Sequence, residues 1–407
     1  MITPKIYCSL DIGAQNIKAG IFQKKNSANM EILATSTQKR QAFHKTTINN
    51  FDDLSEAINI TLKDLKKKSG VTPKGLFLGL DSEFVKIRDV EAVIPLIDKG
   101  NKIISHNDIE KLHDQARLLS LKLDEEILHD SPKSYALDDR ILSYSPSGLY
   151  GRKLSVNMLI LLIEINNLNN IIQAIQQTGS HVLQSFLSSY VTSDIILDKK
   201  DKGLQIIIDF GAKTTDVMLF ENCLLQGFEK ISFGSGHLTK NIAKKLDVSL
   251  SNAENIKKTF CGSSNYYEHL DEEILIKNNT EYLPIKKELI YNAIEPKIKE
   301  LNRQIQNFLK RSENDNLLSS KIQFIGGGSL LPGLVEEIGQ QLKIPTQLAN
   351  CKTLEDQNFL TPLWANTLGV AQRGQIETSK NPFTPSTPAP LPKRVWERMK
   401  MVYEEYF

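Results

Sequence analysis

The chain has little cysteine and no long apolar run. Its four cysteines stand far apart, at Cys8, Cys223, Cys261 and Cys351. Their spacing matches neither a metal site nor a disulfide framework, so we expect reduced, buried thiols in a cytosolic protein. The longest apolar run, 158–163, ends at Glu164. A membrane-spanning helix needs roughly 20 apolar residues, so this run does not predict one.

An excess of charge of one sign is also lacking. The 407 residues carry a formal net charge of +2, which argues against a broad nucleic-acid-binding surface, and we expect no nucleic-acid partner. The apolar fraction of 40% and charged fraction of 24% are typical of a soluble globular protein. The length favours two or more domains. Residues 1–5 lead directly into a strand pattern, without the features of a signal peptide.

What the chain does contain is one short pattern twice. Residues 6–13 and 204–216 each begin as an apolar strand that ends in Asp-x-Gly, and second strands follow at 17–22 and 217–220. A hairpin that turns on glycine lets backbone N–H groups approach a phosphate closely. The aspartate beside it can hold a phosphate-bound Mg²⁺ through water. Two such hairpins facing each other predict a nucleotide site that is gripped from both sides.

The elements around the two patterns also repeat. The first half continues with a strand at 31–36, a helix around 54–65 and a strand at 75–80. The second half continues with a strand at 224–228 and a helix at 236–246. This repetition predicts two similar α/β halves that enclose a cleft.

Two stretches interrupt the repeat. Residues 83–164 contain strand patterns and a helix at 108–121, and we interpret them as an inserted subdomain. Residues 244–319 are mostly helical in pattern and form a second insertion. After them, a strand at 322–325 runs into three glycines, and a helix is predicted after Leu331 with Pro332 in its first turn.

The order of the two Asp-x-Gly segments and the triple glycine resembles the superfamily of actin, chaperone ATPases and sugar kinases. The resemblance narrows to the FtsA family of bacterial division proteins through the segments 124–132, 148–156, 233–239 and 253–257. It extends over nearly the whole chain. It implies an α/β, actin-like fold with two ribonuclease-H-like lobes around a nucleotide cleft, an FtsA-type inserted subdomain and a C-terminal amphipathic helix.

The resemblance also implies a division into domains. The first lobe would comprise residues 1–82 and be completed by 166–198 and about 362–376, with the inserted subdomain at 83–165. The remaining parts would be the second-lobe core at 199–243 and 320–361, its helical subdomain at 244–319, a disordered linker at 377–392 and a membrane-binding helix at 393–407.

Site residues are implied in the same way, with ATP and Mg²⁺ as cofactors. Asp11 and Asp209 would flank Mg²⁺ and its waters, and they are the tentative catalytic pair. The phosphate contacts would come from Gly13, Ala14, Gln15 and Asn16 on one side and from Gly211, Ala212, Lys213 and Thr214 on the other. The nucleoside contacts would come from Glu254 and Lys257, with Gly326, Gly327 and Gly328 passing beneath it and Gly236 as a further cofactor contact.

The second phosphate loop departs from the family, which has glycines where this chain has Ala212 and Lys213. A methyl group at position 212 would obstruct the loop if its backbone needed a positive φ. Lys213 offers a cation for phosphate instead. We expect nucleotide binding, with at most weak ATPase activity.

The last 26 residues change character. Five of the fifteen prolines fall between Pro382 and Pro392, which predicts an extended linker. Beyond it, apolar residues recur at three- and four-residue intervals, namely Val395, Trp396, Met399, Val402, Tyr403, Tyr406 and Phe407. A short helix with this face suits a bilayer interface. The alternative is a helix that docks on its own protein.

The leading hypothesis is an actin-like, ATP-binding division protein that polymerises and tethers FtsZ filaments to the inner face of the cytoplasmic membrane. Its partners would be FtsZ, which would bind within 244–319, further copies of itself, and later septum proteins. It would be a peripheral protein at the division site. The alternatives are a PilM-type pilus-assembly protein, against which the tail argues, and a small-molecule kinase, which would require an aspartate in a substrate cleft.

Overall fold

The computed structural model describes residues 5–25, 30–40, 51–96, 102–142, 145–261, 270–278, 281–312, 317, 320–351 and 361–380. The predicted linker beyond residue 380 and all seven predicted membrane residues, from Val395 to Phe407, lie outside these ranges. In the part of the chain that is described, no helix is long and apolar enough to cross a membrane.

The first lobe is built on a five-stranded sheet in the order β11-β4-β1-β2-β3. Its strands are β1 (Ile6–Ile12), β2 (Asn16–Lys24), β3 (Met30–Lys39), β4 (Gly75–Leu80) and β11 (His181–Leu187). β1 runs antiparallel to β2 and parallel to β4, which places the turn of the β1–β2 hairpin at the same edge as the end of β4.

The second lobe repeats this arrangement in the order β14-β13-β12-β17-β18. Its strands are β12 (Leu204–Phe210), β13 (Thr215–Glu221), β14 (Leu224–Ile231), β17 (Lys321–Ile325) and β18 (Thr346–Leu348). β12 is antiparallel to β13 and parallel to β17, just as β1 is to β2 and β4. The predicted repetition in two similar α/β halves is therefore confirmed, and the structure adds the parallel strand beside each hairpin.

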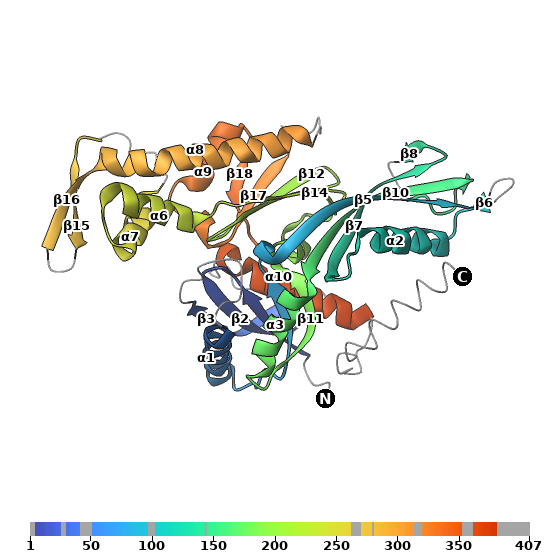
Figure 1. Cartoon of the computed structure of the whole chain (residues 1–407), viewed down its shortest axis with the longest axis horizontal. Coiled ribbons are helices and arrows are strands. Elements are labelled where there is room, and N and C mark those ends of the chain that lie inside the picture. The colour runs from blue at the N-terminus through green and yellow to red at the C-terminus, as the bar shows by residue number, and fades with distance from the viewer. Residues whose placement is uncertain are drawn as a thin grey trace.

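Helices cover both faces of the first sheet. The amphipathic helices α1 (Phe51–Ser69) and α3 (Ile165–Gln176) bury their apolar faces in one core with β1, β2 and β4. On the opposite face lies α10 (Thr361–Lys380), whose buried side chains share a core with β2 and β4. The short helices α4 (Ser188–Val191) and α5 (Ser193–Ile196) follow β11 and pack on α10, which joins the two halves (Figure 1).

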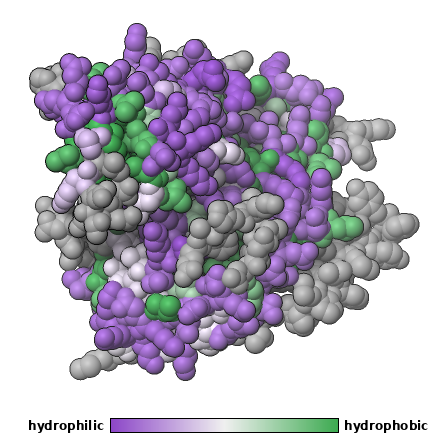
Figure 2. Space-filling model, turned by 60° about the vertical axis from the view of Figure 1, so that its left-hand side comes forward, coloured by the Kyte–Doolittle hydropathy of each residue, from purple (hydrophilic) through white to green (hydrophobic). Residues whose placement is uncertain are grey.

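The second lobe carries its helices at one end of the molecule (Figure 1). These are α6 (Ser235–Leu246), α7 (Leu250–Phe260), α8 (Lys287–Arg311) and α9 (Leu334–Leu342), with a projecting hairpin of β15 (Glu273–Asn278) and β16 (Glu281–Lys286). Figure 2 turns this end toward the viewer and shows hydrophobic residues in small, separate groups among hydrophilic ones.

The inserted subdomain forms a sheet of its own at the other end of the molecule (Figure 1). Its strands are β5 (Val85–Pro95), β10 (Lys153–Glu164), β7 (Glu125–Leu137) and β8 (Arg140–Leu142), with the small pair β6 (Lys102–Ile103) and β9 (Tyr150–Gly151). The helix α2 (His106–Ser120) covers one face, and Ser105 caps its N-terminus. A 3₁₀ turn, η1 (Ser82–Phe84), leads from β4 into β5.

Two local predictions are wrong. The glycine segment forms a 3₁₀ turn, η4 (Gly327–Leu330), and the next helix begins only at Leu334, so Pro332 precedes the helix. The reason is that Gly333 has a φ of 70°, which breaks the chain direction before the helix. The linker predicted from residue 377 is also too long, because α10 continues to Lys380.

Candidate functional site

The two Asp-x-Gly hairpins close with the same hydrogen bond. The N–H of Gly13 donates to the Asn16 carbonyl at 3.1 Å, and the N–H of Gly211 donates to the Thr214 carbonyl at 3.0 Å. A Cβ atom at Gly13 would lie 3.0 Å from its closing carbonyl oxygen, and one at Gly211 would lie 3.1 Å from its own. Glycine is therefore needed for the tightness of both turns.

Both hairpins face one cavity of about 520 Å³ between the lobes. Most of the predicted site residues line it, namely Asp11, Gly13, Ala14, Gln15, Asn16, Asp209, Gly211, Ala212, Thr214, Glu254, Lys257, Gly326, Gly327 and Gly328. Two predicted residues, Lys213 and Gly236, are not among the lining residues. The structure thus brings together most of the predicted set, while its contacts to a nucleotide stay a prediction.

Arg40 supports the first hairpin through two hydrogen bonds. Its buried guanidinium donates from Nη1 to the Gly13 carbonyl at 2.9 Å, and its backbone N–H donates to the Gln15 carbonyl at 2.9 Å. Burial lowers the pKa of Arg40 to about 10, and the carboxylates of Asp81 and Glu83 oppose that shift. Arg40 remains charged at neutral pH, and its contribution is to support the loop.

The second hairpin is held by the start of α6. The N–H of Ser235 donates to the Gly211 carbonyl at 2.9 Å, and the N–H of Gly236 donates to the Ala212 carbonyl at 2.9 Å. A Cβ at Gly234 would lie only 2.6 Å from the Ala212 carbonyl carbon. Ala212 is not among the non-glycine residues with a positive φ, so its methyl group is accommodated without backbone strain.

The glycine segment closes the cavity from the second lobe. Gly326 has a φ of 87°, and a Cβ there would overlap Asp209 Oδ1 and lie 2.6 Å from the Phe210 carbonyl oxygen. A Cβ at Gly328 would lie 2.7 Å from the Phe210 ring. Glycine is required here because the segment packs directly on the end of β12.

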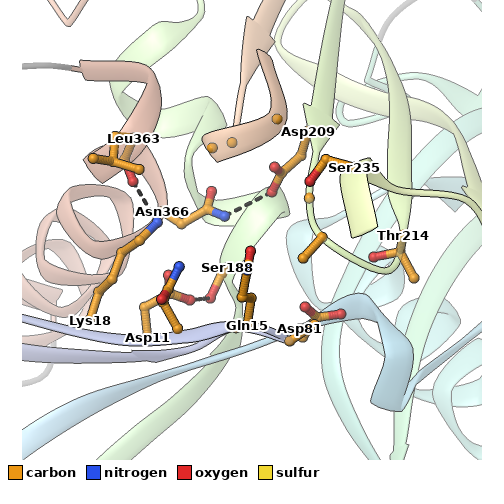
Figure 3. A pocket seen from close by; sticks show the side chains of 18 of the residues that line it. Asp11, Gln15, Lys18, Asp81, Ser188, Asp209, Thr214, Ser235, Leu363 and Asn366 are labelled. Carbon is orange, nitrogen blue, oxygen red and sulfur yellow. Dashed lines mark hydrogen bonds between the residues drawn. The ribbon is translucent and has the colours of Figure 1, made fainter. Parts of the chain in front are cut away.

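The two predicted metal-organising carboxyl groups lie in this cavity, one from each lobe (Figure 3). The Ser188 hydroxyl donates to Asp11 Oδ1 at 2.7 Å, and Asn366 Nδ2 donates to Asp209 Oδ2 at 2.7 Å. Burial raises the pKa of Asp11. Burial also raises the pKa of Asp209 to about 6, and the nearby Asp11 carboxylate adds to this effect.

The residues that lie opposite these two aspartates were not predicted from the sequence as part of the site. Strand pairing sets Lys18 opposite Asp11 and Asp216 opposite Asp209, and all four side chains line the cavity. Lys18 Nζ donates to the Leu363 carbonyl at 2.6 Å (Figure 3). The signal was available, because Lys18 and Asp216 each follow their aspartate by seven residues across a hairpin of the same length.

Asp216 is the most perturbed of these acids. Ser82 donates to its Oδ1 at 2.5 Å and Ser189 donates to its Oδ2 at 2.7 Å. Burial raises the pKa of Asp216 to about 8, with the Asp209 carboxylate acting in the same direction. This carboxyl group therefore keeps its proton to higher pH than an ordinary aspartate does.

The predicted nucleoside contacts form a compact polar group between α6 and α7. Lys257 Nζ lies 2.7 Å from Glu254 Oε2 and donates to the Thr239 hydroxyl at 2.9 Å. Thr239 donates to the same Glu254 oxygen at 2.7 Å. Both α7 side chains therefore have their orientation set before any ligand is bound.

The carboxyl groups fit a hard divalent cation. Asp11 and Asp209 supply oxygen atoms from opposite lobes, and burial raises the pKa of both groups. A bound cation would favour their charged forms. Mg²⁺ favours carboxylate, water and phosphate oxygens together. Among the described residues, no three His, Cys, Asp or Glu side chains are grouped so as to hold a metal ion directly.

Comparison with known proteins identifies the family. The family model for the cell division protein FtsA matches residues 206–369, and the model for the SHS2 domain inserted in FtsA matches residues 83–162. Together they match more than half of the chain. The chain belongs to the FtsA family. This finding favours the leading hypothesis over the PilM-type and kinase alternatives.

Curated FtsA proteins resemble the chain along most of its length. FtsA of Pseudomonas aeruginosa is 21% identical over 376 residues, which cover 91% of this chain and 89% of the relative. FtsA of Bacillus subtilis is 24% identical over 364 residues, which cover 88% of this chain and 82% of the relative.

Solved structures establish the actin-like fold. A PilM–PilN type IV pilus biogenesis complex aligns with a TM-score of 0.62 at 15% identity, covering 90% of this chain and 98% of that chain. MreB 5 of Spiroplasma citri bound to AMPPNP aligns with a TM-score of 0.51 at 12% identity, covering 93% and 98%. The predicted fold class is therefore confirmed, apart from the C-terminal helix.

Proposed function

We propose that this FtsA-family protein binds ATP with Mg²⁺, polymerises, and tethers FtsZ filaments to the inner face of the cytoplasmic membrane, where it recruits later division proteins. It would act at the division site as a peripheral membrane protein. The proposal includes the domain boundaries predicted from the sequence, except that the linker would begin after Lys380.

The observation that carries the nucleotide part is the pair of identically closed hairpins that face one cavity. Each hairpin presents a glycine turn and an aspartate, which are the groups that a metal-bound polyphosphate requires. Asp11 and Asp209 would hold Mg²⁺ through its waters, and the ion would neutralise phosphate charge. An actin-like neighbour, MreB 5, has been solved with AMPPNP, which supports this choice of ligand.

ATP would act mainly as a conformational ligand. Hydrogen bonds from Ser188 and Asn366 orient Asp11 and Asp209, the two predicted catalytic residues. We expect hydrolysis to be slow, because the second hairpin departs from the family at Ala212 and Lys213. A ligand that closes the two lobes changes the surfaces that neighbouring subunits can contact, which links nucleotide binding to polymerisation. The MamK double helical filament has the same fold, at a TM-score of 0.51.

The helical subdomain of the second lobe would bind FtsZ. Exposed apolar side chains occur on several of its elements, on α7, the β15–β16 hairpin and the start of α8, namely Leu250, Leu275, Tyr282 and Leu289. They are available to a protein partner that contacts this subdomain. The tail helix would supply the membrane contact, and many subunits in a polymer would multiply its weak affinity.

The tether is tested by sedimenting FtsZ polymers with lipid vesicles in the presence of the full chain, of a chain ending at Pro392, and of the full chain with Trp396→Glu. We expect FtsZ to sediment with vesicles only with the unaltered chain. If all three carry FtsZ equally, the tail is not the membrane anchor. If the full chain binds vesicles and FtsZ stays in solution, the proposed partner is wrong.

Nucleotide binding is tested separately with a fluorescent ATP analogue and Mg²⁺. We expect Asp209→Asn to weaken binding by at least about tenfold, because a charge-assisted contact to the hydrated ion is lost. The exposed substitution Lys200→Ala serves as a control and should bind as the unaltered protein does. Equal binding by all three proteins would contradict the assigned site.

A further inference from the structure

The segment 81–85 lies against both phosphate hairpins, which are the β1–β2 and β12–β13 hairpins that would bind phosphate. The chain then enters the inserted subdomain. The Asp81 carboxylate accepts a hydrogen bond from the N–H of Glu83, as the cap of η1. It also lines the cavity with Ala14 of the first hairpin, whose backbone lowers the pKa of Asp81 against the effect of burial. Ser82 donates to Asp216 and lies 3.3 Å from the Thr214 hydroxyl, both beside the second hairpin. The chain then continues directly into β5 at Val85.

Two lysines of the second lobe bind the same segment. Lys213 Nζ lies 3.1 Å from both Glu83 carboxylate oxygens. Lys230, on β14, donates from Nζ to the Ser82 carbonyl at 3.1 Å and to the Val85 carbonyl at 2.9 Å. Both lysines belong to the second lobe, so their contacts tie that lobe to the segment that leads into β5.

The position of Lys213 makes this contact informative. It lies between Ala212 and Thr214, which line the cavity, while its own side chain leaves the cavity and reaches Glu83. The pair is partly buried, with side-chain exposures of 29% for Lys213 and 16% for Glu83, so screening by solvent is incomplete. A hairpin that moves when phosphate binds would therefore pull on Glu83 and on β5.

We propose that Lys213 is a positioning residue whose ion pair with Glu83 couples the second phosphate hairpin to the inserted subdomain. The pair holds the hairpin in its phosphate-ready position and passes movements of the hairpin to β5. This inference rests on the proposed binding of nucleotide and goes beyond it, because it assigns Lys213 a role toward the inserted subdomain in place of the predicted contact to phosphate.

The test combines nucleotide affinity with hydrogen exchange of backbone amides, using AMPPNP and Mg²⁺ on the full chain. In the unaltered protein, we expect AMPPNP to slow exchange both in 211–214 and at the start of β5. Lys213→Ala should weaken binding by about fivefold, as expected for a partly buried ion pair, and abolish the response in β5 while the response in 211–214 persists.

Matched variants separate coupling from a general loss of stability. Glu83→Gln alone should behave like Lys213→Ala, and the double variant Lys213→Ala with Glu83→Gln should be no worse than either single variant, because both changes remove the same ion pair. Lys200→Ala, an exposed lysine in the same lobe, should change neither affinity nor the β5 response. Binding and a β5 response that survive in Lys213→Ala would overturn the inference, as would a double variant in which the two losses of affinity add. No AMPPNP binding by the unaltered chain would instead refute the proposed function.

Discussion

The two Asp-x-Gly hairpins have the same geometry and differ in the residue that lies opposite the aspartate. Both close through a bond between the glycine N–H and a carbonyl three residues on. Opposite the aspartate, however, the first hairpin has the cation Lys18 and the second has the acid Asp216. Lys18 lowers the pKa of Asp11 against the effect of burial, whereas Asp209 and burial together raise the pKa of Asp216. The duplicated scaffold thus places a cation opposite the aspartate in the first lobe and a second acid opposite it in the second lobe.

The hairpins also differ in what supports them. A buried arginine side chain holds the first, and the backbone of a helix start holds the second. Truncation of the Arg40 side chain alone would remove the side-chain support of the first hairpin. Backbone support is disturbed only by a side chain that pushes the helix away, as one at Gly234 would. Gly234 and Arg40 therefore each allow one hairpin to be held, by different chemistry.

Gly234→Ala should have the largest effect. Its Cβ would lie 2.6–2.7 Å from backbone atoms of Ala212 and Lys213, which are not free to move aside. We expect a loss of about 1–3 kcal/mol in the free energy of unfolding, measured with urea, together with weaker nucleotide binding. Gly327→Ala is the matched control for stability, because its Cβ meets only Leu363 Cδ1 at 3.6 Å. Equal stability of the two variants would show that α6 does not hold the second hairpin.

Arg40→Met should release the first hairpin alone. The Gly13 carbonyl would lose the bond from Nη1, at a cost of about 1–3 kcal/mol for a buried charged donor. We expect faster amide exchange in 13–16 and unchanged exchange in 211–214. Faster exchange in both hairpins would mean that their supports are not independent.

Asp216→Asn should change the pH dependence of stability. An acid whose pKa rises from its ordinary value of 3.8 to about 8 on folding binds more protons when folded, so stability falls as pH rises between those values. Thermal unfolding from pH 5 to pH 8 without Mg²⁺ should therefore show a smaller decline in Tm for Asp216→Asn than for the unaltered chain. Parallel curves for the two proteins would place the titrating group elsewhere.

Ala212→Gly should have the smallest effect. Because Ala212 already has a negative φ, glycine relieves no strain and only adds freedom to the unfolded chain. We expect a loss of about 0.5–1 kcal/mol in stability and nucleotide affinity within about twofold of the unaltered chain. A large gain in affinity would mean that the methyl group obstructs the phosphate, which would restore the concern raised by the sequence.

Much of the fold could be predicted, and the reason is local. The strands β1 and β12 follow apolar runs that end in glycine turns, and helix α2 follows a capping serine. The family motifs then predicted the order of the lobes along the chain and most of the residues that line the cavity. The errors at Pro332 and at the end of α10 concern element ends, where a single φ or an extra turn decides the boundary.

Partnerships across the cavity could not be predicted. Ser188 and Asp11 are 177 residues apart, Asn366 and Asp209 are 157 apart, and Lys213 and Glu83 are 130 apart. No periodicity in the sequence indicates which of its many serines or carboxylates will come into contact. The departure at Lys213 was visible in the sequence, while its direction, away from the cavity and toward Glu83, was not.

The sequence by itself determined the two tight hairpins, because each depends on a glycine, an aspartate and a bond spanning three residues. It also determined the family, through motifs spread along the chain. Only the tertiary structure decided how the hairpins are held, which acids retain protons, and where Lys213 points. These properties depend on burial and on distances between lobes, and both arise only when distant segments pack together.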